Sequence, residues 1–426
     1  MEILLATAIA LLAGLMMTRV FRLLHWKFPD VTSFLLAGLI VGPYCLGRLH
    51  LPGLGFPTME DVDSMALITN VALGFIAFAI GNEFRLSQLR ETGRQAVIIG
   101  IFQAVCASLL VDAVLIGLHF VLGEERLPLS VAITLGAIAS ATAPAATLMV
   151  VRQYKAKGPV TDLLLPIVAL DDAVGLVVFA ISFGIAQAID GGSLNIVSIL
   201  VEPVLEIIAS LMLGSIMGWL LSQLEKLFLS NTNRLSMSIA FVIATIALSS
   251  LKFTFGVVHI GFSSLLVCMM LGTVFCNLSD FSADIMSRAD RWTAPLYATF
   301  FVISGAGLEL SVFRYPSVIM IGIAYILVRC LGKYFGARLS STWTHCSETI
   351  RKYLGITLFP QAGVALGMVV TAQALGGEKA ALVRNIILFS VLVYELAGPL
   401  MTRMALQAAG EIVETPKEKT SRDRFR

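Results

Sequence analysis

Two adjacent carboxylates, Asp171 and Asp172, stand in the middle of a long apolar run, IVALDDAVGLVVF (167–179). A charge at the centre of a bilayer costs about 2.5–3.5 kcal/mol on insertion scales. Two like charges ~4 Å apart repel by about 4 kcal/mol at an effective dielectric constant near 20. Such a pair must bind a cation, bind protons or pair with a base. Because neighbours on a helix point about 100° apart, one carboxylate can face a water-filled funnel and the other a partner helix. The alternative is a paired network that only locks the bundle.

A second charged motif, VRCLGKYFG (328–336), places Arg329 and Lys333 one helical turn apart within another apolar run. A desolvated lysine can lose its proton, whereas arginine stays charged. We therefore favour Lys333 as a titrating partner of the carboxylates and Arg329 as a permanent charge. The alternative for Lys333 is that its side chain extends to the cytoplasmic surface of the membrane.

Two further buried acids are secondary ion-pair candidates. Glu395, in LVYELAGPL, is in the middle of an apolar run and could pair with Arg329. Glu206 lies in a span beside a presumed domain boundary. For both, a structural role is favoured over a functional one.

The composition places these residues in a membrane. The 426 residues are 57% hydrophobic and 14% charged, whereas soluble proteins carry about 25% charged residues. Apolar runs of 18 or more residues recur, each long enough to cross the bilayer as a helix. With a net charge of +2 and no block of basic residues, the chain is not expected to bind nucleic acid. No Cys-x-x-Cys pair occurs, so neither a transition-metal site nor any other cofactor is expected.

These runs predict an all-α integral membrane protein with thirteen spans, forming one transporter domain over residues 1–409. The predicted spans are roughly 2–21, 31–47, 64–82, 96–121, 128–150, 161–187, 196–222, 235–251, 255–277, 293–311, 316–337, 350–374 and 381–406. Of the 30 Lys and Arg residues, 22 fall on one side of this arrangement and six on the other. Since positive charge stays cytoplasmic, we expect the N-terminus outside and the C-terminus inside. Residues 410–426 read as a disordered cytoplasmic tail.

The two halves of the chain resemble each other. LLAGLIVGP (35–43) is matched by LLVCMMLGTVFCN (265–277), and a span interrupted at Pro144 is matched by one interrupted at Pro360. Matched spans have opposite orientations, which is typical of the inverted-topology repeats of secondary transporters. We therefore predict repeats over about 31–187 and 255–406. The alternative is chance similarity among apolar segments.

The two interrupted spans predict a binding site. Proline removes a backbone hydrogen bond from a helix, and in lipid such a break survives only where protein or a water-filled cavity satisfies the freed groups. Breaks at corresponding positions of two repeats indicate crossing, partly unwound helices at a transporter's binding site. The alternative is a simple proline kink in each helix. The residues expected to line the crossing are Thr142, Ala143, Pro144, Pro360 and Gln361.

Taken together, these motifs resemble a known family. TAPAAT (142–147), the LDD of 170–172, RCLGK (329–333), LFPQAGVALG (358–367) and YELAGP (394–399) are similar to motifs of the monovalent cation:proton antiporter-2 family. Within it, the chain most resembles bacterial sodium/proton antiporters. The resemblance extends from about residue 20 to 410.

The resemblance implies a fold and a mechanism. It implies the sodium/proton antiporter fold, with a mobile core (spans within about 96–187 and 316–406) and a dimerisation domain in a homodimer of the inner (cytoplasmic) membrane. Asp172 would bind Na⁺ or Li⁺ and H⁺ in competition, with Asp171 as the second carboxylate of the sodium site. Asp171 would form a salt bridge with Lys333 that breaks and forms during transport. Because electroneutral members carry Asn in place of Asp171, the chain is expected to exchange two protons per cation by an elevator mechanism.

Other functions remain open at this stage. The same ligands suit K⁺, so K⁺/H⁺ antiport is the main alternative. A Na⁺-coupled organic-anion symporter on a related fold is an alternative of another class, but it does not need a carboxylate pair with a lysine. A sensor or channel would usually carry a soluble output domain. The chain shows no nucleophile–base arrangement, so it is not expected to be an enzyme.

Overall fold

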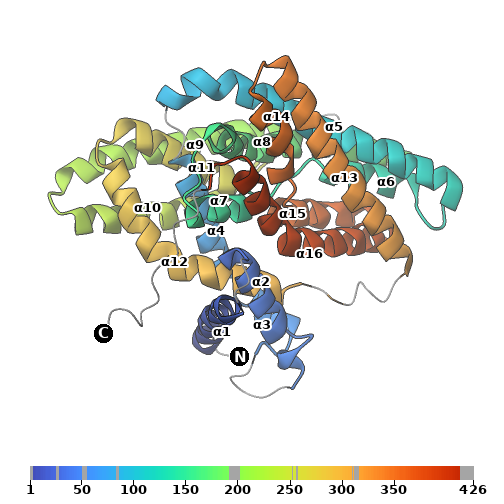
Figure 1. Ribbon diagram of the computed structural model, residues 1–426, viewed down its shortest axis with the longest axis horizontal. Coiled ribbons are helices and arrows are strands. Elements are labelled where there is room, and N and C mark those ends of the chain that lie inside the picture. Colours follow the sequence, from blue (N-terminus) through green and yellow to red (C-terminus); the bar gives the residue numbers. More distant parts are fainter. Residues whose placement is uncertain are drawn as a thin grey trace.

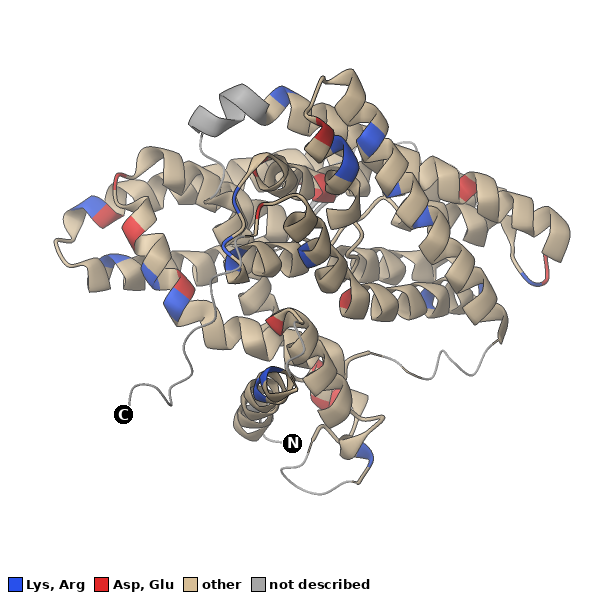
Figure 2. Cartoon of the chain, viewed as in Figure 1, with Lys and Arg blue, Asp and Glu red and all other residues tan. Residues whose placement is uncertain are grey.

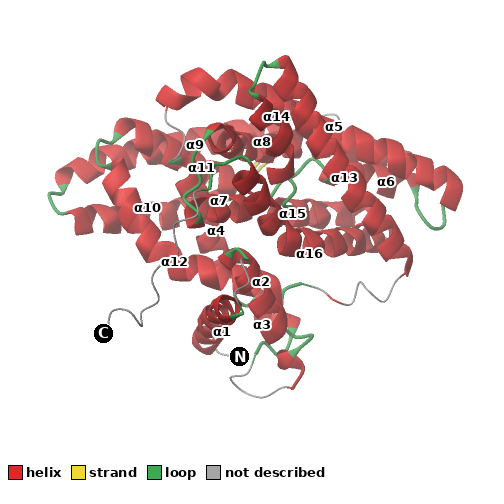
Figure 3. Ribbon diagram, in the orientation of Figure 1, coloured by secondary structure: helices red, strands yellow, loops and turns green. Residues whose placement is uncertain are grey.

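The computed structural model describes residues 3–24, 28–49, 55–82, 86–190, 202–251, 253–255, 258–308, 310 and 316–412. Within these ranges the chain is almost entirely helical (Figures 1 and 3). Residues 413–426, most of the predicted disordered tail, lie outside the described ranges, so that part of the expectation stays a prediction.

The helices of the first half run in the order α1 (Ile3–Leu23), α2 (Asp30–Val41), η1 (Leu46–Leu49), α3 (Met59–Asp63), α4 (Ala66–Gly81), α5 (Leu86–Leu122), α6 (Leu129–Ile138), α7 (Pro144–Gln153) and α8 (Pro159–Ile189). The second half continues with α9 (Glu202–Leu224), η3 (Glu225–Leu227), α10 (Asn231–Ser249), β1 (Phe253–Phe255), β2 (Val258–Ile260), α11 (Ser264–Leu278), α12 (Ser282–Ala306), α13 (Pro316–Trp343), α14 (Glu348–Thr357), α15 (Gly363–Ala372), η5 (Gln373–Leu375) and α16 (Gly377–Ala408).

These helices are those of a multi-pass membrane protein. In the described part of the chain, eight are long and apolar enough to cross a bilayer, and shorter apolar helices lie between them. Charged side chains are sparse along the helices (Figure 2). The all-helical prediction is confirmed, whereas the count of thirteen spans stays a prediction.

Two of the predicted spans are interrupted, as expected. The predicted span 128–150 is divided into α6 and α7, and the span 350–374 into α14 and α15. Each of the four pieces has ten residues. Pro144 stands at the start of α7, where a helix lacks a partner for its backbone N–H in any case. Pro360 lies within the second break, between Thr357 and Gly363.

One predicted span needs correction. The span predicted at 255–277 begins as a helix only at Ser264, because residues 253–255 and 258–260 pair as short antiparallel strands. Both segments alternate apolar and polar residues with a period of two, which is a strand pattern. The span predicted at 31–47 is supported, because Asp30–Leu49 is apolar and long enough to cross a bilayer. Its helix α2 ends at Val41, before Gly42-Pro43, and η1 follows.

The helices pack in two groups. The first contains α1, α2, α4 and α9 to α12, and the second contains α5, α6, α8 and α13 to α16. Figure 1 shows α9, α10 and α11 on one side of the molecule and α5, α6, α13 and α16 on the other. Helix α7 contacts members of both groups.

Inside the first group, two helix pairs make corresponding contacts. Helix α2 packs on α12, and α4 packs on α11. At each crossing a glycine from either helix faces a backbone carbonyl of its neighbour: Gly38 and Gly305 at the first, Gly81 and Gly272 at the second. The α2–α12 and α4–α11 pairs are therefore built alike, as a repeat of opposite orientation requires.

Candidate functional site

The adjacent carboxylates of α8 face different surroundings. Asp171 has no exposed surface, and Asp172 is 5% exposed. Asp171 points towards α5 and α13, where it is hydrogen-bonded, whereas Asp172 lines a cavity. The angle between successive helical residues thus separates the two side chains, as expected.

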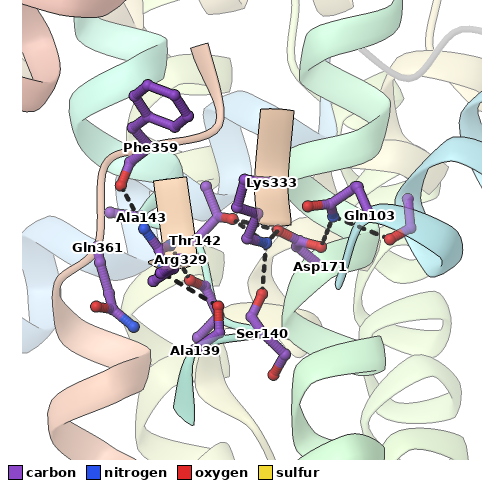
Figure 4. A network of polar contacts seen from close by, with 12 residues as sticks. Gln103, Ala139, Ser140, Thr142, Ala143, Asp171, Arg329, Lys333, Phe359 and Gln361 are labelled. Carbon is purple, nitrogen blue, oxygen red and sulfur yellow. Dashed lines mark hydrogen bonds and ion pairs between the residues drawn. The ribbon is translucent and has the colours of Figure 1, made fainter. Parts of the chain in front are cut away.

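Asp171 is held by a complete polar network (Figure 4). Lys333 Nζ lies 2.9 Å from Asp171 Oδ2, and the other two ammonium contacts are Ser140 O at 2.5 Å and Thr142 Oγ1 at 2.9 Å. Thr142 also donates to Asp171 Oδ2, and Gln103 Nε2 donates to Asp171 Oδ1. Since an ammonium has three donor hydrogens, Lys333 is fully satisfied without water.

Arg329 satisfies the carbonyls at the two breaks. Its guanidinium donates to Ala139 O at 3.0 Å and Ala141 O at 2.6 Å, just after α6, and to Phe359 O at 2.7 Å, just after α14. The ring of Tyr394 lies 4.7 Å from the guanidinium carbon. The carbonyl ends of helices carry partial negative charge. The buried guanidinium therefore stabilises the ends of both interrupted helices.

The two breaks also bond directly to each other. Ala143 N donates to Pro360 O at 2.9 Å, and Gln361 Nε2 donates to Ile138 O at 2.9 Å. Gln361 is further bonded to the hydroxyl of Tyr325 on α13. Protein groups thus satisfy Ala143 N and the carbonyls of Ile138 and Pro360 at the breaks, which lipid could not do.

Asp172 opens onto a cavity of about 180 Å³ between the two helix groups. Asp172 Oδ1 is buried and has no hydrogen-bond partner within the described residues, and the same holds for Glu395 Oε2. The cavity is lined from the second group and α7 by Ala143, Pro144, Ala145, Ala146, Ala169, Asp172, Ala362, Gly363, Val364 and Glu395, and from the first group by Leu35, Leu73, Ile76, Ala77, Ile80, Leu265, Met269, Phe300 and Phe301. Its walls are thus apolar except at the two carboxylates and the broken helices.

The structure does not bring together every predicted pair. Within the described residues, no ion pair links Arg329 to Glu395, because the guanidinium is occupied by carbonyls. Glu206 lies on α9 and is not part of the cavity lining. The expectation that Arg329 could pair with Glu395 is therefore wrong for this arrangement of the helices.

Sequence reasoning missed three residues of the network: Gln103, Ser140 and Tyr325. Gln103 is a single amide within the apolar run IIGIFQAVCASLL, and this isolation is a signal that could have identified it. Ser140 bonds Lys333 through its backbone carbonyl, which no side-chain pattern reveals.

The model of the transmembrane sodium/hydrogen exchanger family matches residues 7–408, nearly the whole chain. The chain belongs to this family. The chain is 21% identical over 389 residues to the K(+)/H(+) antiporter subunit KhtU of Bacillus subtilis, and the match covers 88% of this chain and 87% of KhtU.

Two solved structures of the sodium proton antiporter MjNhaP1 from Methanocaldococcus jannaschii share the fold. They superpose on this chain with TM-scores of 0.67 and 0.72 at 18% identity, and the matches cover 97% and 98% of this chain and all of theirs. These structures confirm the predicted antiporter fold. Membership of the sodium/hydrogen exchanger family makes the chain a monovalent cation:proton antiporter.

Proposed function

We propose that this antiporter exchanges Na⁺ or Li⁺ for H⁺ electrogenically, with Asp172 as the carboxylate for which cation and protons compete. The observation that carries the proposal is the contrast between the two aspartates. Both oxygens of Asp171 accept hydrogen bonds from fixed donors. Asp172 Oδ1 has no partner within the described residues and borders a cavity. A buried carboxylate without a partner is costly, and a cation or a proton removes that cost.

Competition at one carboxylate yields exchange. A proton from outside displaces the cation from Asp172, and the neutral carboxyl then faces the cytoplasm and releases its proton. The cytoplasmic cation binds in its place. Each time the site moves across the membrane, Asp172 holds either a cation or a proton. The fluxes of cation and proton are therefore coupled in opposite directions.

The pair of Asp171 and Lys333 supports electrogenic exchange. Lysine can release its proton when it is desolvated, unlike arginine. If Lys333 gives up a proton when a cation binds near Asp171, two protons cross for each cation. This stoichiometry is the one that the aspartate at position 171 implies by resemblance.

An elevator movement of the second helix group against the first is part of the proposal. The cavity lies between the groups, and its wall on the first group is apolar, so it offers little to hold the site in one position. Polar links between α7 and the first group would have to break: Arg152 pairs with Asp290, and Gln153 Oε1 accepts a hydrogen bond from Asp30 N at 2.8 Å. We place the chain in the inner membrane with a cytoplasmic C-terminus, as a homodimer joined through the first group.

K⁺/H⁺ exchange is the second candidate. The observation that favours it is the similarity to KhtU, whose name gives K⁺ as its substrate. Carboxylate and carbonyl oxygens bind either ion, and the dimensions of the cavity decide between them. Family membership favours exchange over the symport of an organic anion.

The test is dye-based antiport in proteoliposomes with Na⁺, Li⁺ and K⁺ in turn, with and without an imposed membrane potential. We expect Na⁺ and Li⁺ to dissipate a pH gradient, at a rate that responds to the potential. Asp172→Asn should abolish exchange with every cation. Full exchange by Asp172→Asn would refute the assignment, and activity with K⁺ alone would select the second candidate.

A further inference from the structure

Glu395 lines the same cavity as Asp172 although it comes from a different helix, α16. Its side chain is partly exposed, and it contributes to the cavity surface. Glu395 Oε2 is buried and makes no hydrogen bond within the described residues, just as Asp172 Oδ1 does not. These two carboxylates therefore share one cavity, and each has a free oxygen.

No cation of the protein neutralises this pair in the described part of the chain. Lys333 has all three of its donors on Ser140, Thr142 and Asp171. Arg329 is directed to carbonyls at the two breaks. Within the described residues, neither buried base of α13 therefore forms an ion pair with Asp172 or Glu395.

The remaining surroundings of the cavity favour negative charge. Pro144 and Gly363, the first residues of α7 and α15, both line it. The N-terminal end of a helix carries partial positive charge, equivalent to about half an elementary charge. The cavity therefore combines two carboxylates with helix ends that offset part of their charge.

We propose that Glu395 binds the transported cation together with Asp172, as a second carboxylate ligand from α16. The inference rests on the proposed function, because it takes Asp172 to be the primary cation ligand. Hard monovalent cations are bound by several oxygens, and one carboxylate in an apolar cavity supplies too few. With ligands from α8 and α16, one ion would contact both helices that follow the interrupted helix pairs α6–α7 and α14–α15 in the chain.

A structural role for Glu395 makes a different prediction. If its carboxylate only balances the N-termini of α7 and α15, then its removal lowers thermal stability without changing cation affinity. If it is a ligand, its removal weakens the binding of the cation more than it slows the maximal rate. The Michaelis constant for the cation separates the two roles.

The experiment measures the KM for the cation and the maximal rate of antiport in proteoliposomes for Glu395→Gln and Glu395→Asp. Asp112→Asn is the matched control, because Asp112 lies on α5, faces Gly136 of α6, and also has an unpartnered buried oxygen, but it does not line the cavity. Asp172→Asn is measured in parallel to test the proposed function itself. Size-exclusion profiles in detergent identify variants that do not fold.

We expect Glu395→Gln to raise the KM at least ten-fold with the maximal rate within about three-fold of wild type, and Asp112→Asn to leave the KM unchanged. A KM for Glu395→Gln within three-fold of wild type overturns the inference, as does an equal rise in Asp112→Asn. If Glu395→Gln does not fold, Glu395→Asp decides by the same three-fold limit, because its shorter side chain withdraws the oxygens from the ion. Exchange by Asp172→Asn would instead refute the proposed function, so the two failures are distinguishable.

Discussion

Lys333 Nζ lies 2.9 Å from Asp171 Oδ2, and neither side chain has any exposed surface. Removing one partner of a buried ion pair leaves an uncompensated charge and costs about 3–5 kcal/mol. The pair can therefore dissociate only if a proton or a cation replaces the lost partner. This requirement couples the state of Lys333 to the binding of a cation or a proton at Asp172, which follows Asp171 in the chain.

Replacing Lys333 tests this coupling. We expect Lys333→Gln to exchange cation for proton at a reduced rate, with a weaker response of that rate to an imposed membrane potential, because one titrating charge is gone. The measurement is antiport in proteoliposomes with a potassium diffusion potential. Lys379→Gln is the control, since Lys379 pairs with Asp190 outside the site. If Lys333→Gln responds to the potential as wild type does, the role belongs to another residue, with Arg329 as the first candidate.

Gln103 is predicted to position Asp171. Its amide is the donor to Asp171 Oδ1, and it is fully buried on α5. A lost hydrogen bond to a buried charged group costs about 1.5–3 kcal/mol. We expect Gln103→Leu to slow exchange about ten-fold and to change its pH profile, whereas Gln95→Leu, whose amide bonds Thr344 O, should match wild type. An unchanged pH profile in Gln103→Leu would show that the carboxylate needs no such donor.

Arg329 is predicted to be the main stabiliser of the broken helices. Arg329→Leu leaves three buried carbonyls without a donor, at about 1–3 kcal/mol each. We expect a large fall in thermal stability in detergent, with partial recovery in Arg329→Lys. Arg338→Leu, an exposed residue of the same helix, is the control. A melting temperature for Arg329→Leu equal to that of the control would contradict this role.

The glycine crossings of the first helix group are predicted to tolerate no side chain. A Cβ at Gly272 would overlap Phe78 O of α4, so Gly272→Ala should destabilise the protein by about 1–3 kcal/mol or prevent insertion. Gly38→Ala should behave alike, since its Cβ would overlap Val302 O of α12. Gly117→Ala, with open space around its Cβ, should retain or gain stability. Equal stability of all three variants would mean that the crossings relax freely.

Much of the architecture could be predicted from residue types alone. A charge is costly in lipid, so Asp171 and Asp172 in one apolar run already required a cation, a proton or a base. Proline removes a helical hydrogen bond and kinks or breaks the helix. Pro144 and Pro360, at corresponding positions of the two repeats, predicted two interrupted helices, which the structure confirms. Length and hydropathy could not reveal the paired strands at 253–255 and 258–260, because a short apolar segment fits a helix or a strand.

By itself, the sequence determined that buried carboxylates, buried bases and two breaks must meet in a membrane, because each costs free energy there unless the others satisfy it. The tertiary structure alone decided which of them meet. Arg329 and Lys333 lie on one face of α13, one turn apart. Helix α5 packs against both α13 and α8, and this arrangement directs Lys333 to Asp171 and Arg329 to the breaks. The packing of the helices also placed Glu395 at the cavity of Asp172. The partners of a side chain depend on how the helices are arranged in space, and the sequence periodicity of one helix does not predict that arrangement.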